Sequence, residues 1–378
     1  MTSTPFFARL RERIAEHGGV LNAHLHLDRS GTHDETLRIM RDAVSVNNRS
    51  SLSLATKHSL IPSIHASCCY EPALLAERVR TYIDLLVAAG TTRADTLVDV
   101  TADRVGLTAL EVFLLLKHEY RDVLDLRVGA YSPLGFKDSE SQRWEILVEG
   151  ARLADFIGGL PERDDQADYP DHIGFAESCG RLVTLSQQLG KPLHLHIDQK
   201  NLANENGAEC AIGVINDLGV RVRSIDGEPS IWFVHMISSS AFEESRFQKL
   251  LTSLVEHRLG VICCPSAAIS MRQIRSVSAP THNSIARVLD MLAAGVPVRL
   301  GSDNICDITS PAGTTDLLDE VFVLCNAIRF YDEAILAKLA AGVLLNADDR
   351  SRIQKHLKND DLEMLRVVQQ YQQRREAA

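Results

Sequence analysis

Two histidines separated by one residue are the first side chains of this sequence whose spacing suits metal binding. His24 and His26 lie in the stretch Gly19-Val-Leu-Asn-Ala-His-Leu-His-Leu-Asp28, whose apolar residues predict a short β-strand. Alternate residues of a strand point to the same face, so both imidazoles face one side. Such a pair can bind a metal ion, although a strand with one solvated face would carry the same pattern.

Further imidazole and carboxylate side chains occur at the ends of later apolar runs. They are His196 with Asp198, His235, and Asp303. A lone histidine such as His235 is more often a hydrogen-bonded core residue, but recurrence at four strand ends indicates a shared site. Three neutral imidazoles and one carboxylate can hold a divalent ion and leave a position for water. The ion lowers the pKa of that water toward 7, and a neighbouring carboxylate can take the proton.

Eight apolar runs alternate with helical patterns along the chain. The predicted strands cover residues 19–28, 96–101, 124–131, 155–160, 193–198, 231–236, 260–264 and 296–303. This alternation predicts an α/β fold, a single (β/α)8 TIM-type barrel rather than two domains. Active sites of such barrels lie at the carboxyl ends of the strands, where the histidines and aspartates occur.

The segments outside the barrel read as helical. We expect an N-terminal helix in residues 1–18, the barrel in residues 19–330 and a C-terminal helical extension in residues 331–378. The tail is either solvated or packed against another subunit, so a homo-oligomer is an open expectation. Residues 29–58 are too long for an ordinary loop; we expect a helix around 36–46 and a cap over the site.

Composition limits the class of protein. The chain has 378 residues, of which 45% are hydrophobic and 24% charged, as in an ordinary globular protein. The net charge of −10 argues against a nucleic-acid partner. No apolar run approaches the roughly 18 residues of a membrane span, and the N-terminus lacks a signal-peptide core. We therefore expect a cytoplasmic protein that does not bind membranes, with its eight cysteines reduced.

Together these pieces resemble the amidohydrolase superfamily, and within it the cytosine deaminase-like branch. The matching motifs are His24-Leu-His-Leu-Asp28 for HxHLD, His196-Ile-Asp-Gln199 for His-x-Asp-Glu, Val234-His235 for the histidine ending strand six, and Gly301-Ser-Asp303 for the aspartate closing strand eight. The resemblance implies that His24, His26, His196 and Asp303 ligate one divalent ion. Zinc and ferrous iron both suit this donor set. It also implies that His235 contacts the attacking water or the tetrahedral centre and that Asp303 shuttles the proton.

Three departures from that branch bear on the reaction. Its deaminases use a glutamate where this chain has Gln199, which can orient a substrate but cannot exchange a proton at neutral pH. Strand four offers no lysine for a carbamate bridge between two metals; Glu162, just beyond it, is the nearest candidate. Finally, too few residues precede the first strand for the β-sandwich that often accompanies these barrels, so we expect none.

The remaining polar residues have weaker assignments. Gln199, Asp198 and Asp307 are the candidate substrate contacts, although a solvated loop carboxylate is an equal reading of Asp307. His194 shares a strand face with His196 and is expected to be barrel filler or a neighbour of the ligands. The histidines in loops or helix starts are expected at the surface: His33, His58, His65 and His282.

These inferences predict a metal-dependent hydrolase that cleaves a C–N bond of a small cyclic amide, imide or nitrogen heterocycle. Gln199 favours amide or imide hydrolysis, because Asp303 alone can take the water proton and return it to the leaving nitrogen. One alternative is a deaminase of a pyrimidine- or triazine-like ring that uses another acid, such as Asp198 or Asp307. Another is a non-catalytic metal-binding barrel.

Overall fold

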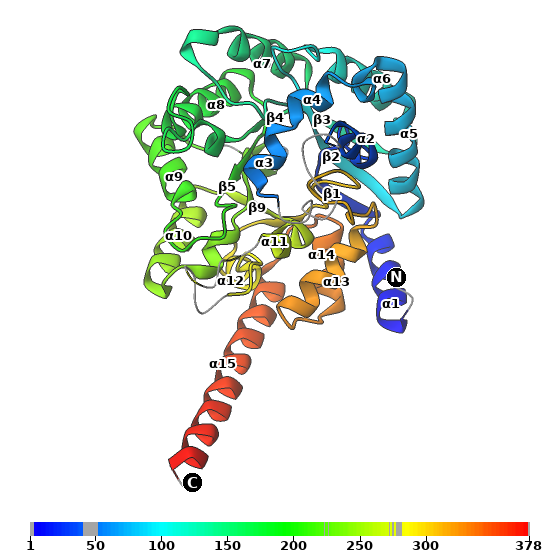
Figure 1. Ribbon diagram of the computed structural model, residues 1–378. Helices are drawn as coiled ribbons and strands as arrows, with labels where there is room; N and C mark the ends of the chain where they lie inside the picture. The colour runs from blue at the N-terminus through cyan, green and yellow to red at the C-terminus, as the bar shows by residue number, and fades with distance from the viewer. Residues whose placement is uncertain are drawn as a thin grey trace.

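The computed structural model describes residues 4–40, 52–222, 224–225, 227–271, 273, 276 and 282–376, with every side chain in the last helix except those of residues 371 and 374–376. Parallel strands form a central barrel and helices surround it (Figure 1). None of the helices in these ranges is both long enough and apolar enough to cross a membrane.

The barrel consists of eight strands. They are β1 (Val20–Leu25), β2 (Thr91–Asp99), β3 (Asp125–Tyr131), β4 (Phe156–Gly159), β5 (Leu193–Ile197), β8 (Ile231–His235), β9 (Gly260–Cys263) and β10 (Val298–Leu300). Neighbours in this order pair in parallel. A bridge between Leu25 and Asp303 brings the chain after β10 beside β1, so the sheet is nearly closed. The predicted (β/α)8 barrel is therefore confirmed.

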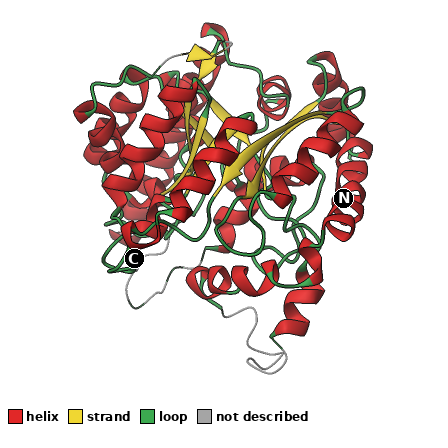
Figure 2. Cartoon of the chain, turned by 90° about the horizontal axis from the view of Figure 1, so that it is seen from above, coloured by secondary structure: helices red, strands yellow, loops and turns green. Residues whose placement is uncertain are grey.

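Helices cover the outside of the strands in both views of the chain (Figure 2). The longer ones are α5 (Pro72–Ala88), α6 (Thr108–Tyr120), α7 (Gln142–Leu153), α8 (Phe175–Leu189), α9 (Gly207–Asp217), α10 (Glu244–Glu256), α12 (Val288–Ala294) and α13 (Leu317–Ala327). Shorter pieces are α2 (His33–Ile39), α3 (Leu54–Ser59), α4 (Ile61–His65), α11 (Pro265–Ser270) and the 3₁₀ turns η2 (Cys68–Tyr70), η3 (Asp138–Glu140), η4 (Pro161–Asp164) and η5 (Ile237–Ala241).

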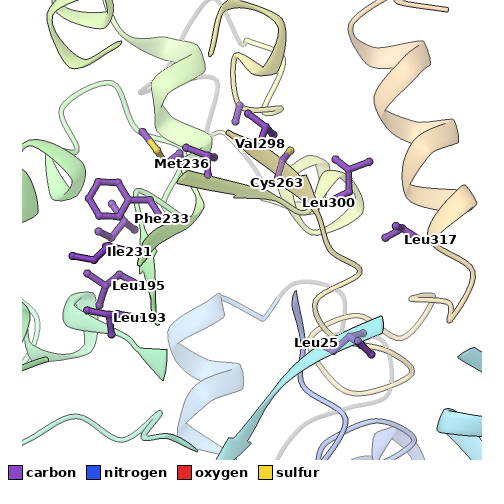
Figure 3. Packing of buried hydrophobic residues seen from close by; sticks show 14 of the residues in the cluster. Leu25, Leu193, Leu195, Ile231, Phe233, Met236, Cys263, Val298, Leu300 and Leu317 are labelled. Carbon is purple, nitrogen blue, oxygen red and sulfur yellow. The ribbon is translucent and has the colours of Figure 1, made fainter. Parts of the chain in front are cut away.

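The alternation of side chains along the strands separates the core from the site. Leu193 and Leu195 of β5, with Phe233 of β8, belong to the hydrophobic core beneath the helices (Figure 3). Because neighbouring residues of a strand face opposite sides, His194 and His196 lie on the inner face of β5. The leucines thus anchor the strand while the histidines enter the barrel.

Small residues make room for large rings inside the barrel. Trp232 of β8 is fully buried, and a Cβ atom at Gly260 of β9 would lie 2.3 Å from its ring. Similarly, a Cβ atom at Gly129 of β3 would lie 2.4 Å from the ring of Phe156. Glycine at these strand positions is therefore required by packing, since the interior is filled by side chains at high density.

Element boundaries differ from the sequence predictions in places. β2 begins at Thr91 rather than residue 96, because its first half pairs with β1 and β3 although it is polar. β10 covers only Val298–Leu300, since the chain leaves the ladder before Asp303. A small hairpin of β6 (Ser224–Ile225) and β7 (Glu228–Pro229) was not predicted. The helix expected around 36–46 begins as α2, and residues 41–51 lie outside the described ranges.

Three further helices flank the barrel. They are α1 (Pro5–Glu16), α14 (Glu333–Ala340) and α15 (Ala347–Glu376). α1 packs against α14, and α15 packs against α12 near its start and then projects away from the barrel (Figure 1). Along the projecting part the side chains of Leu362 and Leu365 are 57% and 58% exposed.

Candidate metal centre

Four strands deliver the predicted donors to one end of the barrel. His24 lies in β1 and His26 directly after it, His196 lies in β5 and His235 ends β8. Asp303 follows β10. All five side chains are buried, and none is more than 6% exposed. The structure therefore brings together residues that are far apart in the sequence.

The donor atoms have the separations that a tetrahedral metal site requires. Nε2 of His24 lies 3.2 Å from Nε2 of His196 and 3.6 Å from Oδ1 of Asp303. Nε2 of His26 lies 3.4 Å from the same carboxylate oxygen. Bonds of about 2.0–2.1 Å in tetrahedral geometry place ligand atoms about 3.3–3.4 Å apart. The three separations among His24, His26, His196 and Asp303 are therefore close to those of ligands around one divalent ion.

A fifth donor lies slightly farther out. Nε2 of His235 is 4.0 Å from Oδ2 of Asp303. Within the described ranges, two sets of donors have ligand atoms within 4.8 Å of one another: His24, His26 and His196, and His24, His235 and Asp303. Asp303 thus offers one oxygen toward the ligand histidines and the other toward His235.

Hydrogen bonds orient two of the imidazoles differently. Nδ1 of His196 donates to the carbonyl of Gly159 at 2.9 Å, which leaves the Nε2 lone pair free for a metal. Arg29 lies 3.0 Å from Nδ1 of His26 and 3.1 Å from Asp99. An arginine only donates, so this contact puts the His26 proton on Nε2, facing Asp303. A metal at His26 Nε2 requires that proton to leave or the Arg29 contact to shift.

Burial sets protonation states that suit a cation. It lowers the pKa of His26 and His196 well below the usual value and that of His235 to about 4. Burial opposes ionisation of Asp303, but its contacts with His24 and the nearness of His235 hold the carboxyl pKa below its ordinary range. Neutral imidazoles and an ionised carboxylate are the forms that bind metal.

The backbone at the strand ends is unusual. His235 has φ of 79° and Asp303 has φ of 61°, both in the left-handed region that non-glycine residues rarely adopt. The turn after β10 also needs Gly301, because a Cβ atom there would lie 2.7 Å from Cβ of His24. Asp303 N donates to the His24 carbonyl at 2.9 Å, so closure of the barrel itself positions two donors. Such strain is typical of functional sites.

A cavity of about 270 Å³ lies at the same end of the barrel, and its lining includes Gln199, which follows His196 by three residues. Its walls include His58, Glu162 and Gln199, and part of the segment expected to cap the site, Ser53–Ala55. His58 was expected at the surface, but it is half-buried, and burial together with the charges of Arg29 and Arg163 lowers its pKa to about 3. The charge of Asp303 acts in the opposite direction and raises the pKa of His58.

Two of the three residues expected to contact the substrate instead accept hydrogen bonds from the protein backbone. Both carboxylate oxygens of Asp198 accept from the first amides of α9, at 2.7 Å from Gly207 and 3.2 Å from Ala208. Burial, and then the charge of Glu205, raises the pKa of Asp198 to about 7. Asp307 is buried rather than solvated, and its Oδ1 accepts from the backbone of Thr309 at 2.7 Å. Only Gln199 of the three lines the cavity.

Two other histidines have structural surroundings. His65 was expected at the surface but is buried, and it lies 3.0 Å from Asp99 and 2.7 Å from Asp103. Burial opposes its protonation, yet bonds to both carboxylates raise its pKa to about 9. His194 is buried with its ring 4.4 Å from that of Phe156, as barrel filler would be.

Sequence reasoning considered Glu162 only as a bridge between metals. The structure places it at the cavity wall, where Oε1 accepts from the backbone of Gln199 at 3.2 Å and Oε2 from its side-chain amide at 3.2 Å. A carboxyl residue directly after a barrel strand is a recognisable signal, since catalytic residues come from such ends.

Comparisons with known proteins agree with this fold. No protein-family model matches the chain. A Haemophilus influenzae protein described only as uncharacterized is 24% identical over 290 residues, which is 76% of this chain and 95% of the relative.

Solved structures are similar over most of the chain. The 5-methylcytosine deaminase of Klebsiella pneumoniae, liganded with 5-fluorocytosine, has a TM-score of 0.71 at 21% identity, covering 89% of this chain and 74% of that one. The N-isopropylammelide isopropylaminohydrolase of Burkholderia multivorans has a TM-score of 0.61 at 19% identity, with 89% and 74% coverage. The N6-methyl-AMP deaminase of Arabidopsis thaliana has a TM-score of 0.55 at 14% identity, with 93% and 99% coverage. The chain therefore shares its barrel fold with solved enzymes of the amidohydrolase superfamily, as its motifs predict.

Proposed function

We propose that this protein is a metal-dependent hydrolase that cleaves a C–N bond in a small cyclic amide, imide or other nitrogen heterocycle. The observation that carries the proposal is the convergence of two sets of donors that share His24: His24, His26 and His196, and His24, His235 and Asp303. Within them, Nε2 of His24 lies 3.2 Å from Nε2 of His196 and 3.6 Å from Oδ1 of Asp303. A divalent ion held there supplies Lewis acidity and lowers the pKa of a water molecule toward 7. Zinc and ferrous iron both suit the donors.

Two residues of the centre have further roles in this proposal. Asp303 Oδ2 faces His235, and an ionised carboxylate there can accept the proton that the attacking water loses. His235 can donate a hydrogen bond to the oxygen on which negative charge develops at the tetrahedral centre. Gln199, at the cavity wall, can orient the substrate through its amide.

The cavity and the structural neighbours bear on the substrate class. A cavity of about 270 Å³ is below the range of about 300–1,000 Å³ that holds drug-sized ligands, so we infer a small-molecule substrate. The names of the Klebsiella and Burkholderia neighbours describe a deaminase and an aminohydrolase. They support deamination of a pyrimidine- or triazine-like ring as the second candidate, beside ring opening of a cyclic amide. Association with further copies of the chain stays a prediction.

The test begins with metal content. Purified protein reconstituted with Zn²⁺ or Fe²⁺ is expected to hold one ion per chain by elemental analysis. The loaded protein is then assayed with aminopyrimidines, aminotriazines, hydantoins and cyclic imides, with ammonia release reporting deamination and loss of the ring chromophore reporting ring opening. Stoichiometric metal without turnover of any compound would favour the non-catalytic barrel, and protein that cannot be loaded would contradict both readings.

A further inference from the structure

Glu162 lies in the cavity wall at the carboxyl end of the barrel. It belongs to η4 (Pro161–Asp164), which follows the carboxyl end of β4. That is the end of the barrel at which the metal donors gather. With Gln199 and His58 it lines the cavity, so its carboxyl group can meet a molecule bound there.

A second carboxyl group, that of Glu205, lies beside Glu162. Consecutive backbone amides hold the two groups: Gln199 N donates to Glu162 Oε1 at 3.2 Å, and Lys200 N donates to Glu205 Oε2 at 3.0 Å. Glu205 also accepts from the hydroxyl group of Ser238. Two carboxyl groups held side by side repel each other when both are ionised, so a proton on one of them relieves the repulsion.

Charge and burial favour the protonated form of Glu162. Burial raises the pKa of Glu162 well above its ordinary value, and the charges of Glu205 and Asp198 raise it further. Burial also raises the pKa of Glu205.

We propose that Glu162 is the catalytic acid of this site, giving its proton to the substrate nitrogen beside the carbon that water attacks. The inference rests on the proposed function, and it answers a need that Gln199 leaves open, since an amide cannot exchange a proton at neutral pH. Gln199 instead holds Glu162 in place through its backbone and side-chain donors. Glu205 is a positioning residue whose nearby charge favours a proton on Glu162.

The transfer balances at an amidine carbon. The water oxygen bonds to the carbon, and the π pair of the ring C=N bond moves to the ring nitrogen, which takes the proton of Glu162. Asp303 takes one water proton and passes it to the departing amino nitrogen, and the C–N bond breaks with its electron pair on that nitrogen. The remaining hydroxyl proton returns to Glu162 as the carbonyl forms. At a cyclic amide, the water oxygen bonds to the carbonyl carbon, Asp303 takes one water proton, and Glu162 protonates the ring nitrogen as the C–N bond breaks with its electron pair on that nitrogen. The new carboxylic acid gives its proton to Glu162, and Asp303 releases its proton to solvent.

Two substrates distinguish a catalytic acid from a residue that only supports the structure, because the leaving group of one needs a proton and that of the other does not. The metal-loaded protein is assayed on 4-nitrophenyl acetate and on the nitrogen compound that the wild type hydrolyses. Nitrophenolate leaves without a proton, whereas an amine does not. Glu162→Gln keeps the shape of the side chain, so kcat on the nitrogen compound is expected to fall about 10²–10⁴-fold with KM little changed. Hydrolysis of the ester and the metal content are expected to stay near wild type. The matched control is Glu256→Gln, an exposed position at the end of α10.

Infrared difference spectra give a readout that does not depend on turnover. Wild type minus Glu162→Gln should show the carbonyl band of a protonated carboxyl group at pH 7, and wild type minus Glu256→Gln should not. Three results would overturn the role of Glu162 alone. They are absence of that band, an equal loss of kcat on both substrates in Glu162→Gln, and a loss of less than about tenfold in kcat on the nitrogen compound. A loaded wild type that hydrolyses no nitrogen compound would overturn the proposed function, and the inference with it.

Discussion

Each end of the barrel carries a cluster of polar side chains, and the two clusters differ in whether their charges are paired. Toward the amino ends of the strands, the ion-pair cluster consists of Arg93, Asp95, Glu228 and Arg299. Arg93 lies 3.2 Å from Asp95 and 3.4 Å from Glu228, and Glu228 also pairs with Arg299. The guanidinium group of Arg299 lies 4.5 Å from the centre of the Trp232 ring. Each charge in this cluster faces an opposite charge.

At the carboxyl ends, the donor cluster of His24, His26, His196, His235 and Asp303 has no such balance. Nε2 of His24 and Nε2 of His196 approach within 3.2 Å, and Nδ1 of both His24 and His235 is buried without a hydrogen-bond partner. Lone pairs that converge on one point cost free energy unless a cation is there. Nε of Arg299 in the ion-pair cluster also lacks a partner, so the difference between the clusters lies in their charge. The ion-pair cluster neutralises itself, whereas the donor cluster has the arrangement that the proposed ion would satisfy.

The largest effect is expected from substituting the proposed metal ligands of the donor cluster. His24→Ala and His196→Ala each remove one of four ligands and should abolish stoichiometric metal binding, with turnover falling at least about 10³-fold because the Lewis acid is lost. The metal-free variants should unfold at no lower denaturant concentration than metal-free wild type, since an unsatisfied donor has been removed. Elemental analysis and urea unfolding measure the two effects. Wild-type metal content in both variants would contradict the ligand assignment.

A smaller effect separates the catalyst from the ligands within the donor cluster. His235→Asn should keep the ion and lose about 10²–10³ in kcat, the usual value of one hydrogen-bond donor to a developing oxyanion. His235 lies farther out than the other donors, at 4.0 Å from Asp303. If this substitution strips the metal, His235 belongs among the ligands and the roles proposed here must change.

The matching substitution at the other end is Glu228→Gln. It leaves the buried Arg299 without its partner and should lower the free energy of unfolding by about 2–3 kcal/mol; Glu228 is partly exposed, so the loss is below the 3–5 kcal/mol of a fully buried pair. Metal content and kcat should not change. Urea unfolding with metal analysis gives both numbers, and loss of metal would show that the two ends are coupled.

The dependence of stability on pH tests the same ion pairs of Glu228. Burial raises the pKa of Glu228, but the charges of Arg299 and Arg93 outweigh it and hold that pKa below the ordinary value. The stabilisation is therefore present above the unfolded-state pKa of about 4.3 and is lost as the pH falls through the folded-state value. Wild type should lose more stability than Glu228→Gln on acidification, since the variant has already lost this contribution.

The barrel was predictable because its strands combine a strong pattern with clear boundaries. β5 alternates leucine and histidine, so one face must enter the core while the other carries donors. β2 and β10 were harder. The polar first half of β2 does not look buried. β10 ends at Leu300, before Asp303, whose left-handed conformation its residue type does not reveal.

Residue types at the strand ends predicted which side chains form the donor cluster. They did not predict which groups the other carboxylates hydrogen-bond. Asp198 and Asp307 follow strands as a substrate contact would, yet their oxygens accept from nearby backbone amides. His65 gave no sequence signal, because the carboxylates that bury it come from Asp99 and Asp103, more than thirty residues later. Which polar groups meet depends on loop paths that a single sequence does not specify.

The smallest expected effect concerns Gln199, which borders the donor cluster without belonging to it. Its side-chain amide donates to Glu162 at 3.2 Å, and the backbone contact between the two residues survives any substitution. Gln199→Ala should therefore cost about one hydrogen bond, ~0.5–1.5 kcal/mol, or roughly 2- to 12-fold in kcat/KM, with the metal retained. Glu162→Gln, its neighbour at the same wall, should cost far more. Gln199→Glu would place a third carboxyl group beside Glu162 and Glu205, raising the pKa of that group of acids by like-charge repulsion.

The measurement is kcat for Gln199→Ala on the nitrogen compound that wild type hydrolyses. A loss of about four orders of magnitude with metal intact would be the size of a general acid and not of a hydrogen bond, and it would move the proton donor from Glu162 to the network that Gln199 holds together.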